Sequence, residues 1–140
     1  MNYYSERSLA VLDTVHPDLV RVFAHVLPRF NHTPVRGIRD LALQKEYMDI
    51  GWSKTLDSRH LPGGGLVPDV AYPDLSWALD ARPWPFNDDR EQLYMFGGFV
   101  LGVALELGIE LRFGGDWDGD KDLRDQTFFD LWHFEIRRHH

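Results

Sequence analysis

Two of the seven histidines stand in settings that suggest metal binding. His60 precedes a glycine-rich turn, and Asp69 follows that turn at the start of the apolar segment 70–72. A histidine on one side of a tight loop and a carboxylate on the other can converge on one ion. The alternative is an ordinary surface turn in which the histidine binds nothing.

The segment before His133 offers a second histidine together with a carboxylate. Asp130 lies three residues before His133. If a strand begins at the histidine, Asp130 stands in the turn just before that strand, and both side chains can reach the same pocket. A carboxylate beside a zinc-activated water is the general base that metal-dependent hydrolysis requires. Because Asp-x-x-His is a common chance pattern and the neighbouring residues are aromatic, packing in the core is the alternative.

Together, His60, Asp69 and His133 would supply the three protein ligands of a catalytic zinc, whose fourth position stays open for water. The chain has no cysteine, which excludes thiolate ligands and disulfides, so a metal must bind through His, Asp and Glu. The spacing alone leaves the hydrolytic site and the purely structural interpretation open.

The elements that must position these residues form an α+β pattern. Helical spacing predicts helices over 5–14, 17–27, 41–50 and 88–107, with Pro17 at a first helical position and Asp88 and Glu91 at capping-box spacing. Because strand-like pieces are scattered around one long helix, we expect a small antiparallel sheet with flanking helices. The strand-like pieces are 35–39, 69–72, 109–113 and 133–136, and the proline-rich segment 61–87 is expected to be an irregular surface excursion.

Composition limits the possible classes of protein. A chain of 140 residues with 44% hydrophobic residues is expected to form one globular domain, residues 1–140, and to be a monomer. The net charge of −7 argues against nucleic acid as a partner. The longest apolar stretch, 93–105, is too short for stable membrane insertion, and no secretory signal is visible, so synthesis in the cytoplasm is expected.

Several of these segments resemble those of a known family. Ser58-Arg59-His60, Asp69-Val70-Ala71, the run 111–118 and the run 129–135 look like bacteriophage L-alanyl-D-glutamate endopeptidases. These endolysins are related to the D-Ala-D-Ala carboxypeptidases and dipeptidases and share the hedgehog/DD-peptidase-like zinc fold. The segments 35–39 and 99–109 match as well, so the resemblance covers most of the chain from Pro17 onward.

The resemblance implies a role for each candidate residue. It implies Zn²⁺ held by His60, Asp69 and His133, with Asp130 as the general base. It implies that Arg39 stabilises the oxyanion or holds a substrate carboxylate, and that Ser58 orders the loop or contacts the substrate.

The implied function is cleavage of the L-Ala-D-Glu bond in the peptidoglycan stem peptide. The enzyme would wait in the cytoplasm of the producing host until its release to the cell wall. The alternatives are a D-Ala-D-Ala carboxypeptidase or dipeptidase that uses the same ligands, and a non-hydrolytic zinc-binding module of the same fold.

The spacing between the first histidine and the aspartate departs from the family pattern. The family places the aspartate seven residues after the first histidine, so Asp69 requires a two-residue expansion of the glycine loop, with Asp74 and Asp80 as the other candidates.

The acidic loop 116–125 could bind Ca²⁺ through carboxylates, although a solvated loop is the alternative. Its carboxylates are Asp116, Asp118, Asp120, Asp122 and Asp125. His139 and His140 receive no role.

Overall fold

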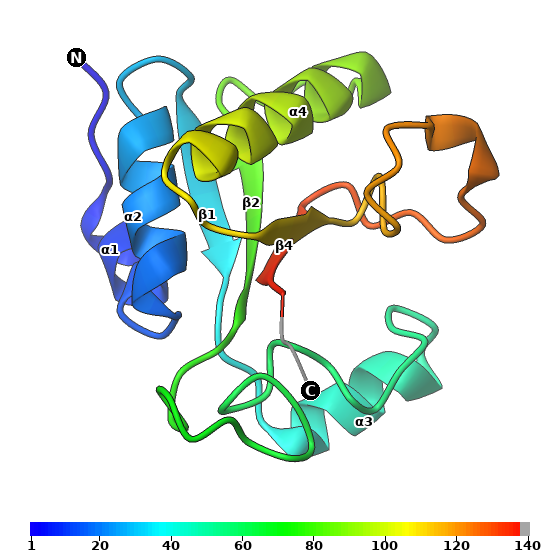
Figure 1. The fold of residues 1–140 in the computed structure, drawn as a ribbon. Helices are drawn as coiled ribbons and strands as arrows, with labels where there is room; N and C mark the ends of the chain where they lie inside the picture. Colours follow the sequence, from blue (N-terminus) through cyan, green and yellow to red (C-terminus); the bar gives the residue numbers. More distant parts are fainter. Residues whose placement is uncertain (138–140) are drawn as a thin grey trace.

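A four-stranded antiparallel sheet organises the computed structural model, which describes residues 1–137 (Figure 1). The strand order is β1-β2-β4-β3, and every neighbouring pair is antiparallel. The strands are β1 (His32–Arg36), β2 (Ala78–Pro83), β3 (Leu111–Phe113) and β4 (His133–Ile136). The expectation of an α+β fold with a small antiparallel sheet is therefore confirmed. His139 and His140 lie outside the described residues.

The helices begin where local capping chemistry places them. Ser5 caps α1 (Glu6–Leu12) by accepting a hydrogen bond from the backbone N–H of Ser8, and α2 (Pro17–Val26) starts at its proline. The long helix α4 (Arg90–Glu106) is capped by Asp89 rather than Asp88, whose φ of 57° lies outside the helical region. The remaining elements are α3 (Leu41–Asp49) and a 3₁₀ turn over Leu123–Asp125. Within residues 1–137, no helix has the length and apolar character needed to cross a membrane.

Side-chain alternation along the strands separates the core from the site. In β4 the buried ring of Phe134 packs with Phe23 of α2 and Phe96 of α4, at centroid distances of 5.3 and 5.9 Å. Successive side chains of a strand point to opposite faces, so His133 and Glu135 face away from these helices. The same alternation in β2 sends Leu79 and Ala81 to the core and Asp80 to the other face.

Strand β2 is the element that the sequence prediction missed. It lies in the proline-rich segment that was expected to be irregular, and Pro83 forms its last residue. Its first four residues are all buried, so polar and apolar positions do not alternate as in a half-buried strand. Alanine and aspartate also have low β-propensity, so neither the hydrophobic pattern nor the residue types indicated a strand. The predicted strand 69–72 is wrong, since this stretch forms bends and Tyr72 has a φ of 55°.

Candidate active site

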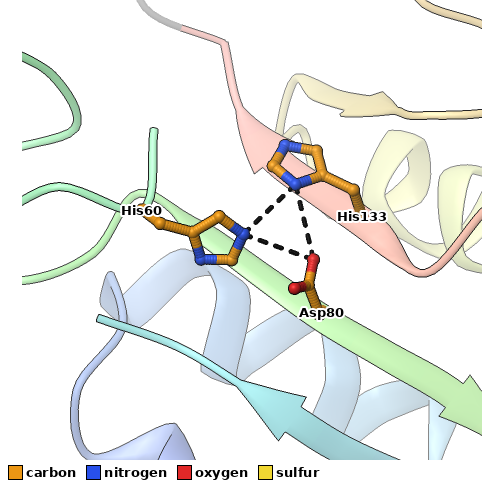
Figure 2. A group of neighbouring side chains, drawn as sticks. All are labelled: His60, Asp80 and His133. Atoms are coloured by element: carbon orange, nitrogen blue, oxygen red, sulfur yellow. Dashed lines mark hydrogen bonds and ion pairs between the residues drawn. The ribbon is translucent and has the colours of Figure 1, made fainter. Parts of the chain in front are cut away.

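Three ligand-type atoms converge on the site face of the sheet (Figure 2). His60 Nε2 lies 3.2 Å from Asp80 Oδ1 and 3.2 Å from His133 Nδ1. His133 Nδ1 and Asp80 Oδ1 close the triangle at 3.4 Å. Asp80 and His133 are partners in the register between β2 and β4, which places their side chains on the same face. All three residues are buried, and we refer to them as the His–Asp–His group.

The dimensions of this triangle fit a tetrahedral zinc ion. Ligand atoms at about 2.0 Å from such an ion stand roughly 3.3 Å from one another, close to the three observed separations. His60 Nδ1 lies 2.6 Å from the carbonyl oxygen of Gly37, and His133 Nε2 lies 2.8 Å from Glu135 Oε1. In the neutral rings these outer nitrogens carry the protons, so two lone pairs and a carboxylate oxygen point at one another. A cation satisfies such a set of acceptors.

The electrostatics of the group also favour a positive charge at its centre. Burial alone would lower the pKa of His133, but hydrogen bonds to Asp80 and Glu135 raise it to about 10. Burial would raise the pKa of Asp80, yet the two histidines hold it well below its usual range. A buried carboxylate that stays ionised requires nearby positive charge, which a metal ion or a proton on the histidines can supply.

Glu135 lies directly behind His133, and the sequence interpretation assigned it no role. Its side chain is buried and accepts a hydrogen bond from Arg112 Nη2 at 2.9 Å. Its other carboxylate oxygen contacts Nε2 of His133 and so orients the imidazole ring. Carboxylates that hold a metal-binding histidine in this way also raise its basicity. Its position two residues after His133 on a strand, hence on the same face, is the signal that could have identified it.

The structure brings Asp80, and not Asp69, to the two histidines. Asp69 is held locally, because its backbone N–H donates to Gly63 O at 2.9 Å and its carboxylate accepts from the backbone N–H of Ala71 at 3.0 Å. The glycine loop is therefore not an expansion that delivers Asp69 to the histidines. The chain returns to the sheet only at β2, where Asp80 is a lone carboxylate in the apolar run 77–81.

Asp130 lies beside the group, where a general base would stand. Its Oδ2 is 3.9 Å from His133 Nδ1, and its side chain is 39% exposed to the cleft. Partial burial raises the pKa of Asp130, and the negative charge of Asp80 adds to this effect, while His133 opposes it. A carboxyl group with a raised pKa is better suited to accept and return a proton near neutral pH.

Arg39 and Ser58 also line the cleft, each fixed by neighbours. The Arg39 guanidinium donates to Gln44 Oε1 at 2.7 Å and lies 4.4 Å from the ring centroid of Tyr47. Arg39 Nη2 lies 3.9 Å from Asp80 Oδ2, so the positive charge of Arg39 acts on the His–Asp–His group. Ser58 Oγ accepts from the backbone N–H of His60 at 3.1 Å, a contact that orders the loop carrying this histidine.

The group opens into a cleft of about 610 Å³, large enough for several residues of a peptide. One wall comes from the segment after α3 and carries Trp52 and Lys54. Trp117, Phe128 and Phe129 also line the cleft, and Lys54 Nζ lies 4.9 Å from the Phe128 ring centroid. The cleft thus combines aromatic walls with charged groups around the buried ligand atoms.

The acidic loop is a second cluster of carboxylates. Ligand oxygens of Asp116, Asp118 and Asp120 lie within 4.8 Å of one another, and only Asp116 is buried. Asp116 Oδ2 accepts from the backbone N–H of Lys121 at 2.9 Å. Asp122 is paired with Arg124 at 3.0 Å. Exposed acidic loops of this kind are common without an ion, so the geometry does not by itself indicate calcium.

Comparisons with known proteins identify the family of the chain. The family model for phage L-alanyl-D-glutamate peptidases matches residues 1–137. The chain is 32% identical over 140 residues to the L-alanyl-D-glutamate peptidase of Escherichia phage T5, covering 94% of this chain and 93% of that protein. The crystal structure of the Serratia marcescens L-Ala D-Glu endopeptidase ChiX matches with a TM-score of 0.69 and 28% identity, over 96% of this chain and 89% of ChiX. The chain therefore belongs to the phage L-alanyl-D-glutamate peptidase family and is a peptidase.

Proposed function

We propose that this peptidase is zinc-dependent and cleaves the L-Ala-D-Glu bond of the peptidoglycan stem peptide. The observation that carries the proposal is the convergence of His60 Nε2, Asp80 Oδ1 and His133 Nδ1 at tetrahedral spacing, with Asp130 beside them in an open cleft. The names of the phage T5 and Serratia relatives support the choice of bond.

The ligand set is His60, Asp80 and His133, and the bound ion would supply Lewis acidity and lower the pKa of a water molecule. Asp130 accepts the proton of the attacking water at its carboxylate and returns a proton to the leaving nitrogen. Gly37 O and Glu135 hold the two imidazole rings in the tautomers that leave the inner nitrogens unprotonated.

Arg39 stabilises the negative charge that develops on the scissile carbonyl oxygen. Its guanidinium is buried and locked by Gln44 and Tyr47, so it contributes a fixed positive charge without reorganisation during the reaction. Ser58 orders the His60 loop, and its place in the cleft lining also allows contact with the substrate.

We further propose the setting in which the enzyme works. Residues 1–140 act as one catalytic domain and as a monomer, which is made in the cytoplasm of the producing host and acts on the cell wall after release.

Digestion of purified peptidoglycan with and without a chelator tests the proposal, with mass analysis of the new termini. We expect chelator-sensitive cleavage that exposes an N-terminal D-Glu. Release of D-Ala would instead identify a carboxypeptidase, and cleavage that the chelator does not inhibit would contradict zinc dependence. Asp130→Ala should abolish turnover and retain zinc, whereas loss of zinc would make Asp130 a ligand.

A further inference from the structure

The strand β1 contains an irregularity at the residue that faces the His–Asp–His group. Pro34 pairs with Ala81 of β2, so regular antiparallel pairing would place Val35 opposite Asp80. The register shifts between Pro34 and Arg36, and Arg36 becomes the partner of Asp80. Residues directly opposite each other share a face, so this shift turns the Arg36 side chain towards the site.

The side chain of Arg36 then makes one anchoring contact and leaves the rest of its guanidinium free. Arg36 Nε donates to Asp80 Oδ2 at 3.0 Å. The other oxygen of this carboxylate, Oδ1, is the one that faces the two histidines. Within residues 1–137 the bond to Oδ2 is the only hydrogen bond of the Arg36 side chain. The side chain is 42% exposed and lines the cleft, with its charge 5.7 Å from the Trp132 ring centroid.

The other cations of the cleft are differently placed. Arg39 is buried, and its Nη1 donates a hydrogen bond to Gln44. Arg112 is paired with Glu135. Arg59 donates NH1 to Gly64 O at 2.8 Å. Lys54 lies over Phe128 and makes no ion pair among the described residues. Arg36 therefore lines the cleft, contacts the Asp80 carboxylate directly, and keeps terminal nitrogens without a hydrogen-bond partner in the described part of the chain.

We propose that Arg36 binds the free carboxylate of the D-glutamyl residue that follows the scissile bond. This inference rests on the proposed function, because the substrate is the L-Ala-D-Glu bond. A D-glutamyl residue has two carboxyl groups, and the one that does not continue the peptide is an anion only a few bonds from the scissile nitrogen. The terminal nitrogens of an arginine match such a carboxylate in a two-pronged, charge-assisted pair. Arg36 thus sets specificity for an acidic residue, while Arg39 serves the scissile carbonyl.

The test compares two synthetic stem peptides that differ only in this carboxylate, one free and one converted to the carboxamide. Wild-type protein should cleave the free acid with a kcat/KM about 10- to 100-fold higher, in line with the loss of a charge-assisted pair. Arg36→Gln should bring this ratio to within about twofold of unity, and Arg36→Lys should leave an intermediate ratio, since lysine keeps the charge without the planar fork. Arg21→Gln, an exposed arginine of α2, is the matched control and should keep the wild-type ratio.

The ratio is measured on one protein sample, so partial loss of zinc or of folded protein cancels. Zinc content and the affinity for the D-glutamyl product peptide, measured by calorimetry, give readouts that do not depend on turnover. A wild-type ratio near unity, or an unchanged ratio in Arg36→Gln, would overturn the assignment and leave Arg36 only as a support for Asp80. Failure of wild-type protein to cleave either peptide would instead count against the proposed function itself.

Discussion

Within residues 1–137, two groups of side chains bring together atoms of the kind that bind metal ions, and their difference is instructive. The His–Asp–His group is buried, mixes nitrogen and oxygen donors, and stands on two paired strands and an ordered loop. The acidic cluster of Asp116, Asp118 and Asp120 offers only oxygen donors, and two of its three members are exposed on a loop. Proximity is common to both clusters, so it does not distinguish a catalytic site.

The partners behind the ligands make the distinction. In the His–Asp–His group, Gly37 O and Glu135 fix the histidine tautomers, and Arg36 binds the outer oxygen of Asp80. In the acidic loop most carboxylates accept hydrogen bonds from nearby backbone N–H groups, which shape the loop itself. Burial with outer partners preorganises a metal site, whereas local turns satisfy carboxylates without an ion.

Replacing Asp80 should have the largest effect. We expect Asp80→Asn to lower zinc affinity sharply and cleavage by at least about 1000-fold, because a carboxamide is a poor zinc ligand and leaves two buried histidines without their anionic partner. Zinc stoichiometry by elemental analysis and peptidoglycan digestion measure both effects. Asp69→Asn is the matched control and should retain zinc and activity. The opposite result for the two variants would restore Asp69 as the ligand.

His32 provides a comparison between buried histidines inside and outside the metal group. Burial lowers the pKa of His32 to about 4, partly opposed by a hydrogen bond to Phe30, whereas the pKa of His133 is raised. The neutral His32 ring therefore contributes stability that is fully present above pH 6.5 and is lost as the pH falls towards 4. The loss amounts to about 3 kcal/mol.

Denaturant unfolding across this pH range measures that loss. His32→Gln keeps hydrogen-bonding groups near Tyr4 but has no titrating ring, so its stability should depend less on pH than that of wild-type protein. Parallel pH profiles for the two proteins would contradict the assignment of a neutral buried His32.

Glu135 tests whether outer partners matter as much as the comparison suggests. Glu135→Gln should weaken zinc binding by about 10- to 100-fold, because the His133 ring loses a carboxylate that orients it and raises its basicity. Competition with a chromogenic chelator measures the affinity. Glu106→Gln, at the exposed end of α4, should leave zinc affinity unchanged. An unaltered affinity in Glu135→Gln would reduce this residue to a packing role.

The acidic loop should give the smallest effects. Asp118→Asn combined with Asp120→Asn should leave zinc content and cleavage within about twofold of wild type, since these side chains are exposed and outside the His–Asp–His group. If the loop binds Ca²⁺, calcium should raise the melting temperature of wild-type protein by a few degrees and leave the variant unaffected. A wild-type melting temperature that ignores calcium would identify a solvated loop.

Much of the fold and of the site followed from the sequence alone. The helices were predicted because amphipathic spacing and caps are local properties, as in α2 and α4. His60, His133 and Asp130 were predicted as one site because each lies in a short segment that resembles the family. The structure brings these three side chains together at the cleft.

Only the tertiary structure decided which carboxylate joins the two histidines. Asp69 was the preferred candidate because a strand was expected directly after it, yet strand pairing sets Asp80 opposite His133, and pairing between distant segments has no local signature. The same holds for Arg36, which reaches the site only because β1 shifts its register against β2. Sequence pointed to the two histidines and the nearby aspartate, while the register of β2 against its neighbours decided which carboxylate lies against the histidines and which cation contacts it.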